Sequence, residues 1–135
     1  MGSMVTFQRP DGQSVNGYLA EPLHAAGAPA IVVIQEWWGL NDQIRGVADR
    51  LALAGYQALV PDLYRGQSTV EAEEAHHLMS GLDFGDAASQ DVRGAVFGFA
   101  GICASLGLAA LRHAVTTETA KTMPSVEPSD LTRRP

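Results

Sequence analysis

The sequence predicts an α/β protein: an N-terminal β-hairpin, a parallel βαβ sheet, then a C-terminal helix and a disordered tail. Three observations support this fold class. A Pro-Asp-Gly turn separates two strand-like stretches near the N-terminus. Two short apolar runs enclose a segment whose apolar residues recur at i, i+3, i+4 and i+7, which is the helical spacing. Strand, helix and strand follow one another within about thirty residues, which favours parallel strands.

The expected hairpin joins residues 4–8 to residues 14–20 through Pro10, Asp11 and Gly12. Proline presets the backbone at the first central position of a turn, and glycine accepts the positive φ that can follow. We therefore expect two antiparallel strands here.

The βαβ unit begins with residues 30–34, a β-branched run typical of a strand buried on both faces. Asn41 or Asp42 can cap the next helix, and Gly55 stands where a helix often ends. Residues 56–64 then form a second buried strand. Because a crossover helix connects parallel strands, we expect the two strands to pair in parallel.

Two further helices are expected downstream. Ser68 and Glu71 fit a capping box, which predicts a helix through Met79. Asp86 can begin the next helix. No linker separates that helix from the apolar stretch that follows, so we expect residues 97–115 to be mostly helical.

The chain divides into three expected parts: residues 1–96, an apolar and divergent segment at 97–115, and a disordered polar tail at 116–135. The net charge of −6 and the lack of a basic run disfavour nucleic acid as a partner. The one cysteine and the absence of an N-terminal apolar signal segment predict a cytoplasmic protein.

An acidic residue follows the first buried strand: Ile31–Ile34 leads into Gln35 and then Glu36, with two tryptophans after it. Ligands of open parallel sheets bind beyond the carboxyl ends of the strands, where backbone N–H groups near a helix start can face an anion or an oxyanion. Glu36 is therefore a candidate site residue. The alternative is a surface glutamate beside aromatics that cover the sheet edge, and the residues alone leave both open.

Three stretches resemble the dienelactone hydrolase family of the α/β-hydrolase superfamily: RPDGQSVNGYLAEP, APAIVVIQEWWGLNDQIRGVADRLALAGYQALVPDLYRG and DAASQDVRGAV. The resemblance runs from about Val5 to Val96. It implies a partial, truncated α/β-hydrolase fold. It also implies a carboxylic-ester hydrolase that acts on a lactone or enol ester with a cysteine nucleophile, without a metal or an organic cofactor.

The resemblance assigns roles at the site. Glu36 would hold the catalytic cysteine until substrate binds, and the N–H of Trp37 would form half of the oxyanion hole. Cys103 would be the nucleophile and the N–H of Ala104 the other oxyanion donor. The stretch Gly101–Ser105 matches Gly-x-Cys of a nucleophile elbow, but it ends in serine where the second glycine belongs. A lone cysteine can equally be a small buried apolar residue.

The acid and the general-base histidine of the family have no counterpart downstream of Cys103. Asp130 lies in the expected tail, and His113 follows on the same expected helix. We therefore expect catalysis to be impaired.

Two non-enzymatic alternatives stay open. One is a soluble interaction module that self-associates through an uncovered sheet edge. The other is a membrane tether through the uncharged stretch Gly94–Leu111, which its glycines disfavour.

Overall fold

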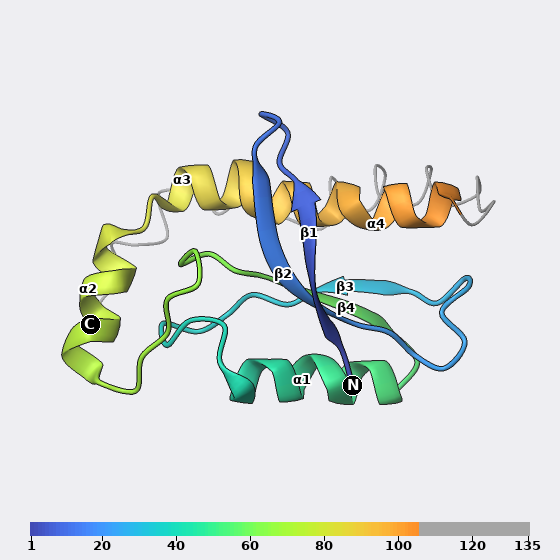
Figure 1. The fold of residues 1–135 in the computed structure, drawn as a ribbon, viewed down its shortest axis with the longest axis horizontal. Coiled ribbons are helices and arrows are strands. Elements are labelled where there is room, and N and C mark those ends of the chain that lie inside the picture. The colour runs from blue at the N-terminus through green and yellow to red at the C-terminus, as the bar shows by residue number, and fades with distance from the viewer. Residues whose placement is uncertain (106–135) are drawn as a thin grey trace, which may run out of the picture.

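The structure, a computed structural model, describes residues 1–105, and residues 100–105 by their backbone alone. It contains one mixed sheet with helices along both faces (Figure 1). The strands are β1 (Ser3–Gln8), β2 (Ser14–Ala20), β3 (Ala30–Val32) and β4 (Gln57–Pro61). The helices are α1 (Asp42–Leu53), α2 (Ala72–Gly81), α3 (Phe84–Asp86), the π-helix η1 (Ala87–Val92) and α4 (Arg93–Ser105).

The strand order is β1-β2-β4-β3, in which β3 pairs with β4 in parallel and the other two pairs are antiparallel. The predicted α/β class, the hairpin and the parallel pair are thereby confirmed. One expectation was wrong: β3 is not buried on both faces. It ends at Val32, and Ala30 and Ile34 are exposed because β3 has a neighbour on one side only among residues 1–105. The fully buried strand is β4.

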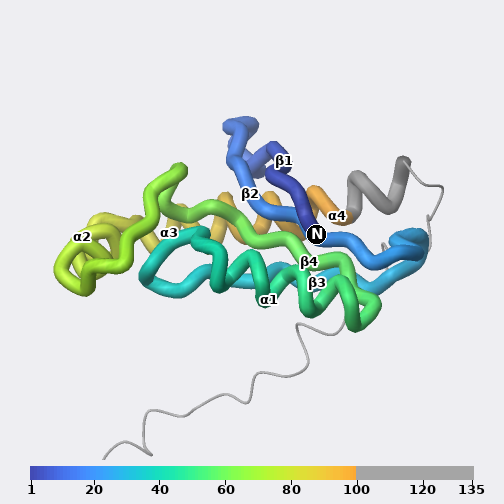
Figure 2. Tube along the Cα trace, turned by 60° about the horizontal axis from the view of Figure 1, so that its bottom comes forward, coloured from blue at the N-terminus to red at the C-terminus, as the bar shows by residue number. Residues whose placement is uncertain are grey.

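The core lies in two layers, one on each face of the sheet, with α1 on one side and α4 on the other (Figures 1 and 2). Alanines of α1 allow the helix to approach the sheet closely. The α1 layer contains Tyr18, Ala20, Leu40, Ile44, Ala48, Ala52, Ala58 and Val60. The α4 layer contains Phe7, Val15, Leu19, Leu59, Ala95 and Phe99. Because side chains alternate between the two faces of a strand, β2 and β4 contribute residues to both layers.

The helix starts agree with the sequence in one case and differ in two. Asn41 caps α1, its Oδ1 accepting from the N–H of Ile44 at 3.1 Å, as expected. The predicted capping box was wrong, because Ser68 pairs with Gly39 in an isolated β-bridge and Glu71 makes no side-chain cap.

Thr69 replaces that capping box, since its hydroxyl accepts from the N–H of Glu71 and donates to Glu74. The helix expected from Asp86 begins earlier, capped by Asp83, whose carboxylate accepts from the N–H of Asp86.

The course of α4 decides where the segment after Val96 lies. Residues 97–105 are helical and continue α4 without a break, as the missing linker predicted. The boundary expected after Val96 falls inside this helix, and the three-part division stays a prediction. The rest of the expected helix and the expected disordered tail lie outside the described residues. No helix within residues 1–105 is both long and apolar enough to cross a membrane.

Candidate functional site

The end of β3 is held by backbone and side-chain hydrogen bonds. The N–H of Val33 donates to the carbonyl of Leu59 at 2.9 Å, which extends the contact with β4 past the strand. Gln35 is buried, and its Oε1 accepts from the N–H of Leu63 at 3.1 Å. The next side chain, Glu36, is exposed. The buried Gln35 therefore anchors the backbone from which an exposed carboxylate projects at the carboxyl end of β3.

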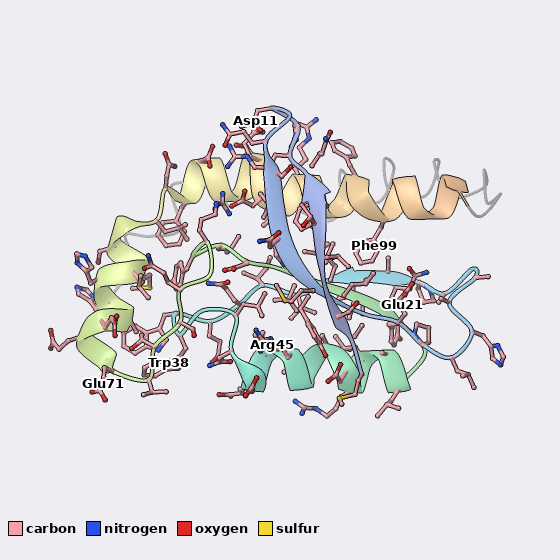
Figure 3. All side chains as sticks on the ribbon, in the orientation of Figure 1. Asp11, Glu21, Trp38, Arg45, Glu71 and Phe99 are labelled. Carbon is pink, nitrogen blue, oxygen red and sulfur yellow. The ribbon has the colours of Figure 1, made fainter. Side chains whose placement is uncertain are left out.

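A tight turn follows Glu36 and sets the orientation of the two tryptophans. The N–H of Gly39 donates to the carbonyl of Glu36 at 3.2 Å, and Gly39 has a φ of 90°. A Cβ on Gly39 would lie 2.5 Å from the carbonyl oxygen of Gln67, so both the backbone angle and the space require glycine here. The rings of Trp37 and Trp38 meet edge to face at 4.9 Å and are half-buried. Trp38 lies on the side of the molecule where α2 lies (Figure 3).

The backbone N–H groups of Trp37 and Trp38 donate to no protein acceptor in the part of the chain that the structure describes. They lie between the carboxyl end of β3 and the N-terminus of α1, where the helix dipole favours negative charge. Such N–H groups can bind an anion or the oxyanion that develops when a carbonyl is attacked. The arrangement combines an exposed carboxylate with unused backbone donors.

Two buried polar atoms near this end lack partners among the described residues: Nε2 of Gln35 and Oδ1 of Asp62. Asp62 follows β4, and its other oxygen accepts from the N–H of Gly66 at 2.7 Å. Buried polar groups are ordinarily satisfied, so these atoms are able to bind a polar group or water. Within residues 1–105 no cluster of three or more acidic, histidine or cysteine side chains could hold a metal ion.

An ion network that the sequence analysis missed is centred on buried Arg9 and Asp91 and joins the hairpin to α3 and η1. Arg9 donates to Asp11, to Asp86 and, at 3.3 Å, to Asp91, which also accepts from Arg65 at 2.9 Å. The hydrogen bond from Arg9 is the main reason that the pKa of the Asp11 carboxyl lies below its usual value, and Asp11 and Asp86 raise the pKa of Arg9.

One signal could have revealed that network. Asp91 is the one charged residue on a helical face otherwise formed by Ala87 and Ala95, and a lone charge at such a position needs a buried partner. Arg65 is itself half-exposed, so its guanidinium joins buried Asp91 to the surface. His76 and His77 are exposed on α2.

Cys103 and Ala104 lie on α4, which packs across β1, β3 and β4. Gly94 lies against Gln8 at the carboxyl end of β1, and Gly98 lies beside Phe7, farther back along that strand. The carboxyl ends of β1, β3 and β4 share one edge of the sheet. The helix therefore begins at the edge where Glu36 lies and leads away from it (Figure 1).

Measured along the helix axis, Cys103 lies about 15 Å from the start of α4. Glu36 and Trp37 are neighbours in the chain and lie just after the carboxyl end of β3. The backbone of Cys103 and Ala104 lies toward the amino ends of the strands. The roles of these four residues stay predictions.

Comparison with known proteins gives consistent matches. A sequence model described as "Dienelactone hydrolase family" matches residues 15–123. A protein of Aquifex aeolicus named as a carboxymethylenebutenolidase is 41% identical over 83 residues, which are 59% of this chain and 35% of that protein. A hydrolase fragment of Escherichia coli is 48% identical over 60 residues, 43% of this chain and 51% of the fragment.

Solved structures agree on the fold. The crystal structure of a protein from Klebsiella pneumoniae named as a dienelactone hydrolase matches with a TM-score of 0.56 and 28% identity, covering 79% of this chain and 45% of that one. This chain thus spans about a third of the length of the first curated relatives that it matches, 35% and 36%. The fold is that of a partial α/β hydrolase.

Proposed function

The chain belongs to the dienelactone hydrolase family, and from this we propose that it carries part of the site of a carboxylic-ester hydrolase for a small lactone or enol ester. One observation carries the proposal. At the carboxyl end of β3, Gln35 anchors an exposed Glu36 next to the unused N–H of Trp37. This is the edge at which open α/β sheets bind ligands.

In the proposed reaction a thiolate attacks the lactone carbonyl, the carbonyl oxygen becomes an oxyanion, and the ring C–O bond breaks to leave an acyl thioester. Water then hydrolyses the thioester to a carboxylate and returns the thiol. The N–H of Trp37 would donate to the oxyanion. Glu36 would hold the thiol before substrate binds, and the tryptophans would limit access of water. Cys103 is the one cysteine that could supply sulfur, with the N–H of Ala104 as second donor.

We propose further that this chain on its own is catalytically impaired. The course of α4 supports this, because the helix leads away from the edge where Glu36 lies. Within residues 1–105 no histidine is hydrogen-bonded to a group of this site as a general base would be: His24 is in the loop before β3, and His76 and His77 are exposed on α2. Loss of triad partners costs several orders of magnitude in rate even where an oxyanion hole remains.

The test measures hydrolysis of an activated ester and of an enol lactone by the full chain, by Cys103→Ala and by Glu36→Gln. We expect no turnover above the uncatalysed rate for any of the three proteins. Iodoacetamide should alkylate the Cys103 thiol with a pH midpoint of about 8.5, the ordinary value for a free thiol, or higher. Turnover abolished by Cys103→Ala, together with a thiol already reactive near pH 6, would show that the impairment proposal is wrong.

A second candidate function is a binding module, favoured by the open edge of β3. On this edge the described part of the chain supplies no neighbouring strand. We propose that the chain self-associates through it, since unpaired strand edges bind other strands. A monomer at every concentration, measured by sedimentation velocity, would contradict this.

A further inference from the structure

Backbone hydrogen bonds around the turn that carries the two tryptophans form a connected series. The N–H of Thr69 donates to the carbonyl of Trp38 at 3.1 Å. The N–H of Gly39, which belongs to the same peptide unit as that carbonyl, donates to the carbonyl of Glu36 at 3.2 Å. The Glu36 carbonyl shares its own peptide unit with the N–H of Trp37. Two peptide units therefore connect the Thr69 N–H to the Trp37 N–H, and we call this series the peptide relay.

The relay fixes the direction of the Trp37 N–H. A peptide unit is planar, and in its trans form the N–H and the C=O point in opposite directions. No cis peptide bond occurs within residues 1–105. The bond that Gly39 donates to the Glu36 carbonyl therefore orients the Trp37 N–H as well. The donors follow one another in one direction along the relay, so each bond polarises the next, by roughly 10–30% per bond.

Side-chain hydrogen bonds hold Thr69, the first donor of the relay, at the start of α2. The side chain of Thr69 is 9% exposed. Its hydroxyl donates to a carboxylate oxygen of Glu74 at 2.7 Å and accepts from the N–H of Glu71 at 3.0 Å. The position of the relay is thus tied to the first turn of α2, as well as to the turn after β3.

The segment after β4 contacts the tryptophan turn at both of its ends. Before the turn, the N–H of Leu63 donates to Oε1 of Gln35 at 3.1 Å. After it, Ser68 pairs with Gly39 in an isolated antiparallel bridge. A Cβ on Gly39 would lie 2.5 Å from the carbonyl oxygen of Gln67, so the two segments are in close contact there. These contacts leave little room for the turn to rotate.

We propose that Thr69 is a positioning residue for the oxyanion donor, and that its backbone N–H orients and polarises the N–H of Trp37 through the peptide relay. This inference rests on the proposed function, which assigns the Trp37 N–H to the oxyanion. Preorganised donors stabilise an oxyanion because they need no reorientation when its charge develops. An N–H whose own peptide carbonyl accepts a hydrogen bond is also a stronger donor.

The test is nuclear magnetic resonance of the isotope-labelled full chain carrying Thr69→Pro, because proline removes the N–H that begins the relay. We expect the Trp37 amide proton to resonate upfield of its position in the unsubstituted chain. Exchange of the Gly39 amide should accelerate by roughly two- to tenfold, the loss expected for one hydrogen bond. Thr69→Ser keeps both the N–H and the hydroxyl, so it should leave both signals unchanged.

Val70→Pro is the matched control. Val70 is 86% exposed, and its N–H donates to no acceptor within residues 1–105. Both signals should therefore stay as they are in the unsubstituted chain. Unchanged signals in folded Thr69→Pro, or equal changes in the two proline variants, would overturn the proposal. A lower urea midpoint for Thr69→Pro without a shift of the Trp37 amide would also overturn it, because Thr69 would then act on stability alone.

Scalar coupling across hydrogen bonds provides a second measurement if Thr69→Pro does not fold. In the unsubstituted chain we expect coupling between the nitrogen of Thr69 and the carbonyl carbon of Trp38. We expect it also between the nitrogen of Gly39 and the carbonyl carbon of Glu36. Absence of either coupling would contradict the relay. None of these measurements requires turnover, so failure of the relay and failure of the proposed hydrolysis are distinguishable.

Discussion

Replacing Phe99 by alanine tests whether α4 packs on the sheet as the structure has it. The ring projects from α4 toward the strands (Figure 3) and is 5% exposed among Phe7, Leu19 and Leu59. Phe97 on the same helix provides the control, since it is 52% exposed and its ring lies 5.4 Å from the guanidinium of Arg93. The two substitutions remove the same atoms from two different environments.

The magnitudes follow from burial. A phenylalanine side chain buries about 150–250 Å², which at about 25 cal/mol per Å² corresponds to roughly 4–6 kcal/mol. Alanine retains the Cβ, so Phe99→Ala should lower the free energy of unfolding by about 3–5 kcal/mol. Phe97→Ala should lower the free energy of unfolding by about 1 kcal/mol. Loss of the contact with Arg93 accounts for at least about half of that amount.

The assay is urea unfolding followed by circular dichroism, at one low protein concentration for all variants. Domains have a total stability of about 5–15 kcal/mol, so Phe99→Ala could leave little folded protein. Phe99→Leu, with an expected cost of about 1–2 kcal/mol, keeps the measurement possible. Equal shifts in the urea midpoint for the Phe99 and Phe97 variants would refute the packing of α4 on this face.

Three further predictions concern a helix cap and two titrating groups. Asn41→Ala should lower the free energy of unfolding by about 1 kcal/mol in urea titrations, and Asn41→Asp should retain it, because the cap accepts from the N–H of Ile44. The hydrogen bond from Arg9 lowers the pKa of the Asp11 carboxyl, so its stabilising contribution is present above the usual value of 3.8 and is lost as the pH falls through the lower value. Urea midpoints of Asp11→Asn should therefore decline less steeply in that acid range, and an identical decline would contradict the assignment. Burial raises the pKa of the Tyr18 hydroxyl above 10.0, so stability should be lost as the pH rises beyond that value, and less steeply in Tyr18→Phe.

Local signals were sufficient for the elements of the first half. The Pro-Asp-Gly turn predicted the hairpin, and the cap at Asn41 with the apolar stripe behind it predicted α1. The capping box failed because Ser68 and Glu71 fit a pattern whose geometry depends on the backbone around them, and that backbone pairs Ser68 with Gly39 instead. A pattern of four residues contains no information about a bridge to a residue far away in the chain.

At the candidate site, the sequence indicated that Glu36 follows a strand at the carboxyl edge, because strand order along the chain implies that position. The exposure of its carboxylate and the bond from Leu63 to Gln35 depended on how β3 and β4 pair. The direction of α4, which carries Cys103 away from that edge, could not be predicted from a Gly-x-Cys pattern.

The sequence by itself determined the hairpin, the βαβ order, the α1 cap and the family, since each depends on residues close together in the chain or on a long matching motif. The tertiary structure alone decided that β3 pairs on one side only among residues 1–105, that Arg9 meets Asp91, and that Phe99 rather than Phe97 is buried. These features are contacts between residues far apart in sequence. Their energies depend on burial and geometry, which exist only once the sheet and its two helical layers have assembled.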